Sequence, residues 1–201
     1  MNTEPLKKLS DQPIANQHQL FWKLLEPDHA RAEAFCRRLM AGREEGDDLY
    51  QDSLLKAMNK FHTLKDLGAF KGWLYRIIVN QHKNRRGRAW GKKRVALTSQ
   101  AEKIESGPDP AAVLSARRWL VRAMAVLSAD ERALVSLFEL ESWTIGELAA
   151  MYRRPTGTIK ARLARARKKM RREIERYLTR HEEIKTDGAA HAFSQSQQST
   201  D

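Results

Sequence analysis

The stretch TIGELAAMYRRPTGTIKARLARARKKMRREIERYL, residues 144–178, decides the fold of this chain. Apolar residues in its first part recur at i, i+3, i+4 and i+7, which predicts one apolar helical stripe: Ile145, Leu148, Ala149 and Tyr152. Thr144 and Glu147 have the spacing of a capping box at the start of that helix. Pro155 disfavours helical geometry in the residue before it, so the helix is expected to break at Arg153 and Arg154.

A second helix is expected from about Thr156, with a narrow apolar face and a basic remainder. Its apolar stripe consists of Ile159, Leu163, Ala166, Met170 and Ile174. Residues 155–178 contain nine Lys or Arg against Glu173 and Glu175. Basic helix faces are commonly only solvated surface. A short helix, a proline break and a basic amphipathic helix together nevertheless favour a helix-turn-helix whose second helix enters the DNA major groove.

The overall charge also indicates a polyanionic partner, because the 201 residues carry a formal net charge of +12 and the pI is near 10.0. Cys36 is the only cysteine, which excludes an intramolecular disulfide and fits a reducing compartment. Residues 1–20 lack an apolar core of signal-peptide length, and no run of about 18 apolar residues predicts a membrane span. We therefore expect a soluble, cytoplasmic, nucleic-acid-associated protein without membrane insertion.

Hydrophobic periodicity predicts an all-α chain of two small helical domains joined by a flexible linker. Residues 1–15 are expected to be an N-terminal tail, and residues 16–94 the first domain. The linker, residues 95–112, includes SGPDP, whose two prolines cannot lie inside a helix. Residues 113–179 form the second domain, which contains the helix-turn-helix. Residues 180–201 are polar and of low complexity, and are expected to be disordered.

Local signals mark the starts of further helices. Asp47 is expected to be the N-cap of a helix whose inward side chains are Tyr50, Leu54, Met58 and Phe61. Asp66 is expected to cap the next helix, whose apolar spacing is the cleanest in the chain: Phe70, Trp73, Leu74, Ile77 and Ile78. Ser128 and Glu131 predict another capping box.

No enzyme, metal site or cofactor is predicted. The histidines are scattered without metal-ligand spacing: His18, His29, His62, His82, His181 and His191. The stretch GRAWGKK from Gly87 lacks the spacing and the Ser or Thr of a phosphate-binding loop.

Two long stretches together resemble the extracytoplasmic-function (ECF) sigma factors of bacterial RNA polymerase. The first is GDDLYQDSLLKAMNKFHTLKDLGAFKGWLYRIIVNQHKNRRGR, from Gly46 to Arg88. The second is LSADERALVSLFELESWTIGELAAMYRRPTGTIKARLARARKKM, from Leu127 to Met170. Within it, Glu147 and Ala149 match the family's Glu-x-Ala, while Gly157 and Thr158 match the Gly-Thr that opens its recognition helix. The resemblance covers about residues 20–178.

The resemblance implies a non-enzymatic protein that binds core RNA polymerase, recognises promoter DNA and helps to open it. Its first domain, 16–94, would be the region 2-like domain, which docks on the β′ clamp and reads the −10 element. Its second domain, 113–179, would be the region 4-like domain, which contacts the β flap and reads the −35 element. The linker would thread towards the RNA exit path. Whether an anti-sigma factor holds the protein, and which promoters it reads, stay open.

The family's functional positions fall on three groups of residues here. The resemblance implies that the recognition helix contacts the −35 element through Thr158, Lys160, Ala161, Arg162, Ala164, Arg165 and Arg167. It implies −10 contacts, including a base-capturing loop at 61–69, by Phe61, His62, Leu64, Lys65, Trp73, Arg76, Asn80, Lys83, Arg85, Arg86 and Arg88. Polymerase docking is expected at Asp48, Leu49, Gln51 and Asp52. Trp73 shares an apolar stripe, so a core role competes with strand contact there; exposed acids are likewise often only solvated.

Three positions depart from the family's pattern: Arg153 stands where glycine is usual and would need positive φ, Ala161 replaces a serine, and Asn84 replaces an aspartate. A stand-alone helix-turn-helix regulator is the main rival interpretation, but it leaves residues 70–88 unexplained. An RNA-binding or ribosome-associated basic protein is a second rival.

Overall fold

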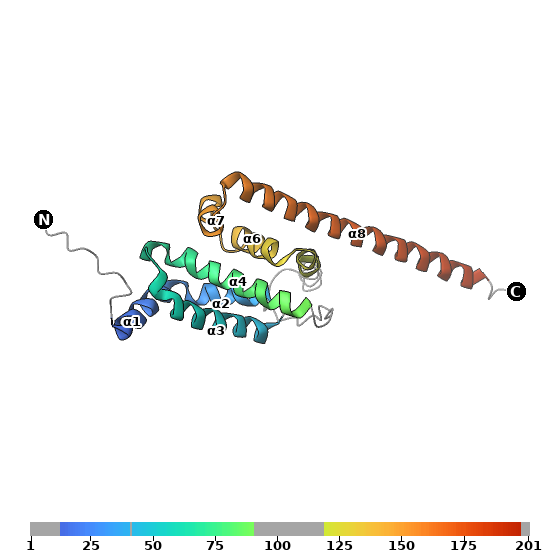
Figure 1. Cartoon of the computed structure of the whole chain (residues 1–201). Coiled ribbons are helices and arrows are strands. Elements are labelled where there is room, and N and C mark those ends of the chain that lie inside the picture. The colour runs from blue at the N-terminus through green and yellow to red at the C-terminus, as the bar shows by residue number, and fades with distance from the viewer. Residues whose placement is uncertain (1–12, 41, 91–118, 198–201) are drawn as a thin grey trace. The chain divides into compact units, whose positions relative to one another are not determined.

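The computed structural model describes residues 13–40, 42–90 and 119–197, and every regular element within these ranges is a helix (Figure 1). The prediction of an all-α chain is confirmed. The predicted linker, residues 95–112, lies outside the described residues. The elements are α1 (Ile14–Leu25), η2 (Glu26–Asp28), α2 (His29–Leu39), α3 (Arg43–Lys60), η3 (Phe61–Thr63), η4 (Leu67–Ala69), α4 (Phe70–Trp90), α6 (Ala129–Glu139), α7 (Ile145–Tyr152) and α8 (Thr156–Gln197).

The chain forms two compact units. The first contains α1 to α4, α6, α7 and α8 as far as Leu163. The second contains residues 119–127, mostly helical, and the remainder of α8. In the second unit the indole of Trp119 meets the Tyr177 ring edge-on at 4.7 Å, and the Arg122 guanidinium lies 4.3 Å from the centre of that tyrosine ring.

Aromatic side chains fill one end of the core of the first unit. Phe21 contacts the rings of Phe61 and Phe70 edge-on, with centroids 5.4 and 5.5 Å apart. Trp73 packs beside Phe70 at 5.9 Å and remains half-buried. Edge-to-face pairs of this kind add to the stabilisation that burial itself provides. The core role of Trp73 is therefore supported, and part of the residue is still accessible.

The start of α3 differs from the prediction. The helix begins at Arg43 with Gly42 as N-cap, and Asp47 lies inside the helix, where its carboxylate accepts a hydrogen bond from Arg37 of α2. A Cβ on Gly46 would stand 2.5 Å from the Cα of Arg37, so the close crossing of α2 and α3 requires glycine there. The assignment of Asp47 as N-cap is wrong because this acid serves the crossing instead.

The inward face of α3 is also rotated from the predicted one. Tyr50 is buried as expected, but Leu54 and Met58 are only half-buried. The other buried positions on the helix are Gly46, Leu49, Ser53 and Ala57. Small residues let α2 approach closely, so packing follows them and not the most apolar stripe.

The remaining local predictions about helix starts hold. Phe70, Leu74, Ile77 and Ile78 of α4 are buried. The Asp66 carboxylate accepts a hydrogen bond from the Gly68 N–H at 2.9 Å, in the 3-10 turn that leads into α4. Complete capping boxes open α6 at Ser128 and Glu131, and α7 at Thr144 and Glu147.

The break between α7 and α8 has the backbone expected of it. Arg153 takes left-handed geometry, with φ 52° and ψ 52°, and its N–H reaches the carbonyl groups that end α7. A non-glycine residue in this conformation costs about 1 kcal/mol. Pro155 then precedes α8, and its carbonyl accepts from the N–H groups of Thr158 and Ile159.

At the end of the chain α8 continues to Gln197, and the predicted disorder of residues 180–201 stays a prediction. Residues 181–197 contain no proline and several good helix formers, HEEIKTDGAAHAFSQSQ, so nothing in their sequence stops a helix that has already begun.

Replacing Thr144 by alanine is expected to lower the free energy of unfolding by about 1 kcal/mol at neutral pH. Hydrogen bonds from the Thr144 backbone N–H (2.7 Å) and hydroxyl (2.8 Å) lower the pKa of Glu147. A lowered carboxylate pKa contributes stability above the ordinary glutamate pKa of about 4.3, and this contribution fades as pH falls through the lowered value.

Urea unfolding at several pH values checks this expectation. The difference between the wild type and Thr144→Ala should shrink in acid. Thr179→Ala, at an exposed mid-helix position of α8, is the control and should show no loss. A Thr144→Ala deficit that is independent of pH would contradict the role given to Glu147.

Candidate nucleic-acid and polymerase interfaces

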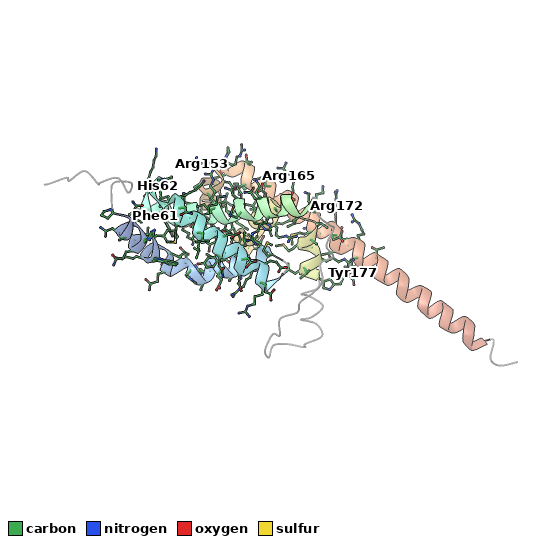
Figure 2. All side chains as sticks on the ribbon, turned by 60° about the horizontal axis from the view of Figure 1, so that its bottom comes forward. Phe61, His62, Arg153, Arg165, Arg172 and Tyr177 are labelled. Atoms are coloured by element: carbon green, nitrogen blue, oxygen red, sulfur yellow. The ribbon has the colours of Figure 1, made fainter. Side chains whose placement is uncertain are left out.

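The start of α8 presents the first candidate surface. Ile159, Leu163 and Ala166 are buried, as the apolar stripe predicts, and Met170 is half-buried. The outward side chains are exposed: Thr158, Lys160, Ala161, Ala164, Arg165 and Arg167. Figure 2 shows Arg165 and Arg172 projecting from the same long helix. The buried stripe thus fixes which face of α8 is free to approach DNA.

The two arginines expected near phosphates lie beside the buried stripe and not opposite it, since each residue turns the helix by about 100°. Arg162 is half-buried; its guanidinium lies 3.6 Å from the Asp130 carboxylate and 5.7 Å from the centre of the Tyr152 ring. Arg167 is exposed on the other side of the stripe. This arrangement suits arginines that flank a groove while Arg165 faces it.

The second candidate surface follows one face of α4 and the turns before it. Trp73, Arg76, Asn80 and Lys83 recur at three- or four-residue intervals, so they share one face of the helix. His62 and Lys65 are exposed in the loop before α4. Phe61 and Leu64, also expected to meet the −10 strand, are 2% and 8% exposed, so their side chains belong to the core here.

The cationic end of α4 is partly engaged within the protein. Arg85 pairs with the Asp52 carboxylate and donates to the Asp48 carbonyl oxygen at 3.1 Å. Lys83 lies 3.1 Å from Asp130. Arg86 and Arg88 lie on α4, beyond the described side chains. Arg85 was predicted to contact DNA, but in the structure it links α4 to α3 through Asp52 and the Asp48 carbonyl oxygen.

The outer face of α3 is the third candidate surface. Asp48, Gln51 and Leu55 lie on one side of the helix, opposite its buried positions, and are exposed. Leu49, which was expected to dock with them, is fully buried, because it is on the inward face. Leu55 was missed by the sequence analysis although it is 62% exposed at the centre of this face. Helical spacing from Asp48 and Gln51 would have found it.

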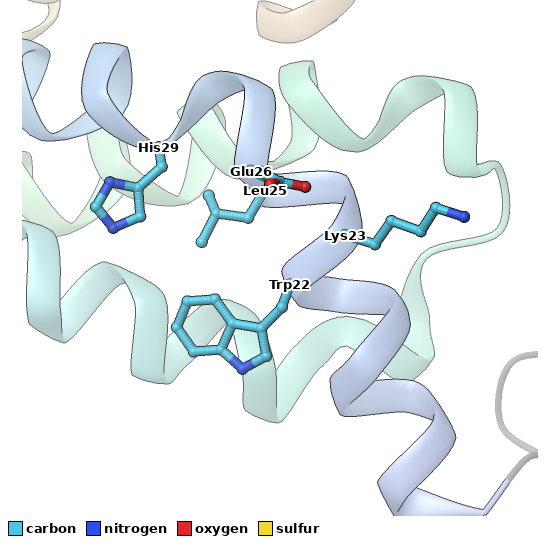
Figure 3. A pocket seen from close by; sticks show the side chains of 5 residues that line it. All are labelled: Trp22, Lys23, Leu25, Glu26 and His29. Carbon is cyan, nitrogen blue, oxygen red and sulfur yellow. The ribbon is translucent and has the colours of Figure 1, made fainter.

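A hollow of about 440 Å³ lies beside α1, η2 and α2. Figure 3 shows Trp22, Leu25 and His29 around the same space. The Trp22 indole is 47% exposed there. The described side chains form no cluster of His, Cys, Asp and Glu able to hold a metal ion. Among the described residues, no helix has the length and apolar character needed to cross a membrane.

Family models match the chain in two places. The model of Sigma-70 region 2 matches residues 24–91, and the model of Sigma-70, region 4 matches residues 117–170. The first match contains the α3 and α4 surfaces, and the second contains α6, α7 and the start of α8.

Curated relatives agree with these matches. The ECF RNA polymerase sigma factor SigM of Mycobacterium tuberculosis is 28% identical over 159 residues, covering 79% of either chain. The ECF RNA polymerase sigma-E factor of Salmonella typhimurium is 31% identical over 145 residues, covering 66% of this chain and 75% of that protein.

Two solved structures are similar in fold. The sigma factor RpoE, solved in complex with the anti-sigma factor NepR from Bartonella quintana, aligns with a TM-score of 0.60 and 25% identity, over 77% of this chain and 96% of that one. CnrH, solved in complex with the cytosolic domain of CnrY, aligns with a TM-score of 0.57 and 20% identity, over 83% and 95%.

Proposed function

The chain belongs to the ECF RNA polymerase sigma factors, and from this membership we propose how its three surfaces divide the work of promoter recognition. It is a promoter-recognising sigma factor, a non-enzymatic initiation factor that binds core RNA polymerase and promoter DNA. The observation that carries this function is the occurrence of both family regions in order, 24–91 and 117–170. A stand-alone regulator has no use for the first of them.

The start of α8 reads the −35 element in this proposal. Its N-terminal turns carry the exposed side chains of Lys160, Ala161 and Arg165. In a recognition helix, this N-terminal end is the part that reaches base edges. The exposed Thr158 hydroxyl, at the N-terminal end of the helix, suits a phosphate oxygen. Arg162 and Arg167 flank the groove and neutralise phosphates, which fixes position without sequence information.

The α4 surface and the loop before it receive the −10 strand. A base that leaves the duplex must be held outside the stack, and an aromatic side chain can return about 1 to 3 kcal/mol by stacking on it. The accessible part of Trp73 offers such a platform, while His62, Lys65, Arg76 and Lys83 supply polar and cationic contacts nearby along the chain. Phe61 and Leu64 support the loop from the core.

The outer face of α3 docks on the polymerase clamp. Asp48 and Gln51 have exposed side chains, and neither side chain has a partner among the described residues. Leu55, which follows Gln51 by one helical turn on the same face of α3, is an exposed apolar side chain. An apolar centre with polar neighbours is the usual anatomy of a protein interface. Asp52 contributes from the edge, where it already holds Arg85.

Two further proposals follow from the family. Both structural neighbours were solved with a second protein, named as an anti-sigma factor in the case of NepR. This supports an anti-sigma factor as a partner of this chain too. Co-purification of the protein with its partners from the native source tests this proposal. Because its partners are core polymerase and promoter DNA, we place the protein in the cytoplasm.

The double substitution Asp48→Lys with Gln51→Ala tests the docking surface. It should weaken binding to core polymerase by about 10-fold or more, since hot-spot losses commonly exceed 1.4 kcal/mol. The helical circular dichroism should not change, because both side chains are exposed. Titration calorimetry with core polymerase measures the affinity.

The matched control is Glu26→Lys with Gln19→Ala, which alters charge equally at exposed positions of η2 and α1. It should bind polymerase like the wild type. Equal affinities for the wild type and the Asp48 variant would move docking away from α3.

A further inference from the structure

A second cationic site in the first unit is a small, partly open pocket. Residues of α4, α6, α7, the following turn and α8 surround a cavity of about 190 Å³. Its charged lining consists of four cations and one carboxylate: Arg76, Lys83, Arg154, Arg162 and Asp130. Four positive charges and one negative charge leave a formal excess of +3. Such an excess, focused in a small cavity, attracts anions.

The one carboxylate is already shared between two of these cations. Asp130 lies 3.1 Å from Lys83 and 3.6 Å from Arg162. Arg76 and Arg154 also line the cavity, and neither forms an ion pair or hydrogen bond with the described residues. Two arginines that line the cavity therefore have no counter-charge among the described residues.

Neutral donors line the same cavity. The Tyr152 hydroxyl is buried and has no hydrogen-bond partner within the described structure. Burial, assisted by nearby Asp130, raises the pKa of this hydroxyl, so it remains a protonated donor. The side-chain amide of Asn80 also lines the space. A buried donor without an acceptor is uncommon in proteins, and an oxygen-rich anion in the cavity would satisfy it.

We propose that this cavity binds the phosphate group of a small, freely diffusing polyanion, such as inorganic phosphate, diphosphate or a nucleotide. A phosphate offers several acceptor oxygens, which match the fork of donors on each guanidinium. Its two negative charges offset most of the +3 excess. The lining residues come from α4, α6, α7, the following turn and α8, and the small volume matches one phosphate group.

The bound anion would also act on promoter recognition, and this consequence rests on the function proposed above. Arg76 and Lys83 belong to the surface assigned to the −10 strand, and Arg162 to the helix assigned to the −35 element. An anion that holds them together competes with DNA for the same cations. By thermodynamic linkage, promoter DNA then weakens anion binding by the same factor.

Calorimetric titration of the full-length protein with phosphate, and separately with diphosphate, tests the site. Ionic strength is held constant with chloride. One saturable site is expected, with diphosphate binding more tightly than phosphate. Tyr152→Phe and Arg154→Gln should each weaken binding by about 10-fold or more, because each removes a hydrogen bond to a charged group. ATP as a third titrant distinguishes free phosphate from a nucleotide.

Arg31→Gln is the matched control: it removes one charge at an exposed position of α2 outside the cavity and should bind like the wild type. Tyr152→Phe should melt at the wild-type temperature in chloride, since its hydroxyl has no partner to lose. Equal anion affinity in all four proteins would show only general charge attraction and overturn the site. So would an Arg154→Gln defect seen with promoter DNA but not with phosphate or diphosphate. Transcription in phosphate-free buffer tests the sigma function separately.

Discussion

Arg165→Ala is expected to flatten the sequence preference of the polymerase holoenzyme at one or two base pairs of the −35 element. The discrimination lost there should be about 10- to 100-fold, because a bidentate arginine–guanine contact is worth about 1 to 3 kcal/mol. Arg167→Ala should instead lower affinity about equally for all sequences. It should also reduce the salt slope of binding by about one unit, as expected when one phosphate contact is removed.

The geometry of α8 supports this difference between two neighbouring arginines. Ile159, Leu163 and Ala166 are buried, which fixes the rotation of the helix. At about 100° per residue, Arg165 lies on the side opposite this stripe, while Arg167 lies beside it. Arg165 forms no ion pair or hydrogen bond with the described residues and is exposed, so its guanidinium is available for a base edge.

Holoenzymes made with each variant separate these outcomes when they are tested on a panel of single-base −35 variants at two salt concentrations. Arg31→Ala, an exposed arginine of α2, serves as the charge control and should change neither preference nor salt slope. Equal, sequence-blind losses for Arg165→Ala and Arg167→Ala would mean that α8 contributes charge alone.

The part of the chain that matches the region 4 model, residues 117–170, was the more predictable part. Capping boxes at Ser128 and Thr144 act between residues three apart, so their sequence spacing is sufficient to find them. The left-handed Arg153 followed from the break before Pro155 and from the family's usual glycine. The stripe of α8 was readable because the start of a helix that is buried on one side keeps a regular period.

The α2–α3 crossing could not be read in the same way. Its contact uses Gly46, which carries little apolar signal, and an Arg37–Asp47 ion pair between residues ten apart. Asp47 therefore looked like a cap, and Leu49 looked like part of an exposed face. Hydrophobic periodicity detects a face that is apolar, not one that is small.

The candidate site shows a similar limit. The resemblance named Trp73, Arg76, Asn80 and Lys83, which share one face of α4, as −10 contacts, and this role stays a prediction. Sequence spacing gave no sign that Lys83 and Arg162 would share Asp130, because this contact joins residues far apart in the chain. Pairwise contacts of this range depend on tertiary packing, which one sequence does not reveal.

The isolated protein is expected to bind promoter DNA only weakly and to gain specificity with core polymerase. The surfaces proposed for the −10 and −35 elements lie in the two family regions, 24–91 and 117–170, which are separated along the chain. Simultaneous binding to two DNA elements requires a fixed separation, and a scaffold that sets it can raise overall affinity by about 10²- to 10⁴-fold. Lys83 and Arg162 are, in addition, held by Asp130 in the protein alone.

Footprinting of one promoter by the protein, with and without core polymerase, tests the sigma function most directly. With core polymerase, protection should cover both the −35 and −10 elements, and bases near −10 should become reactive as the duplex opens. At the same concentration the isolated protein should protect neither element. Tight, sequence-specific protection by the isolated protein, unchanged when core polymerase is added, would contradict the account and favour a stand-alone regulator.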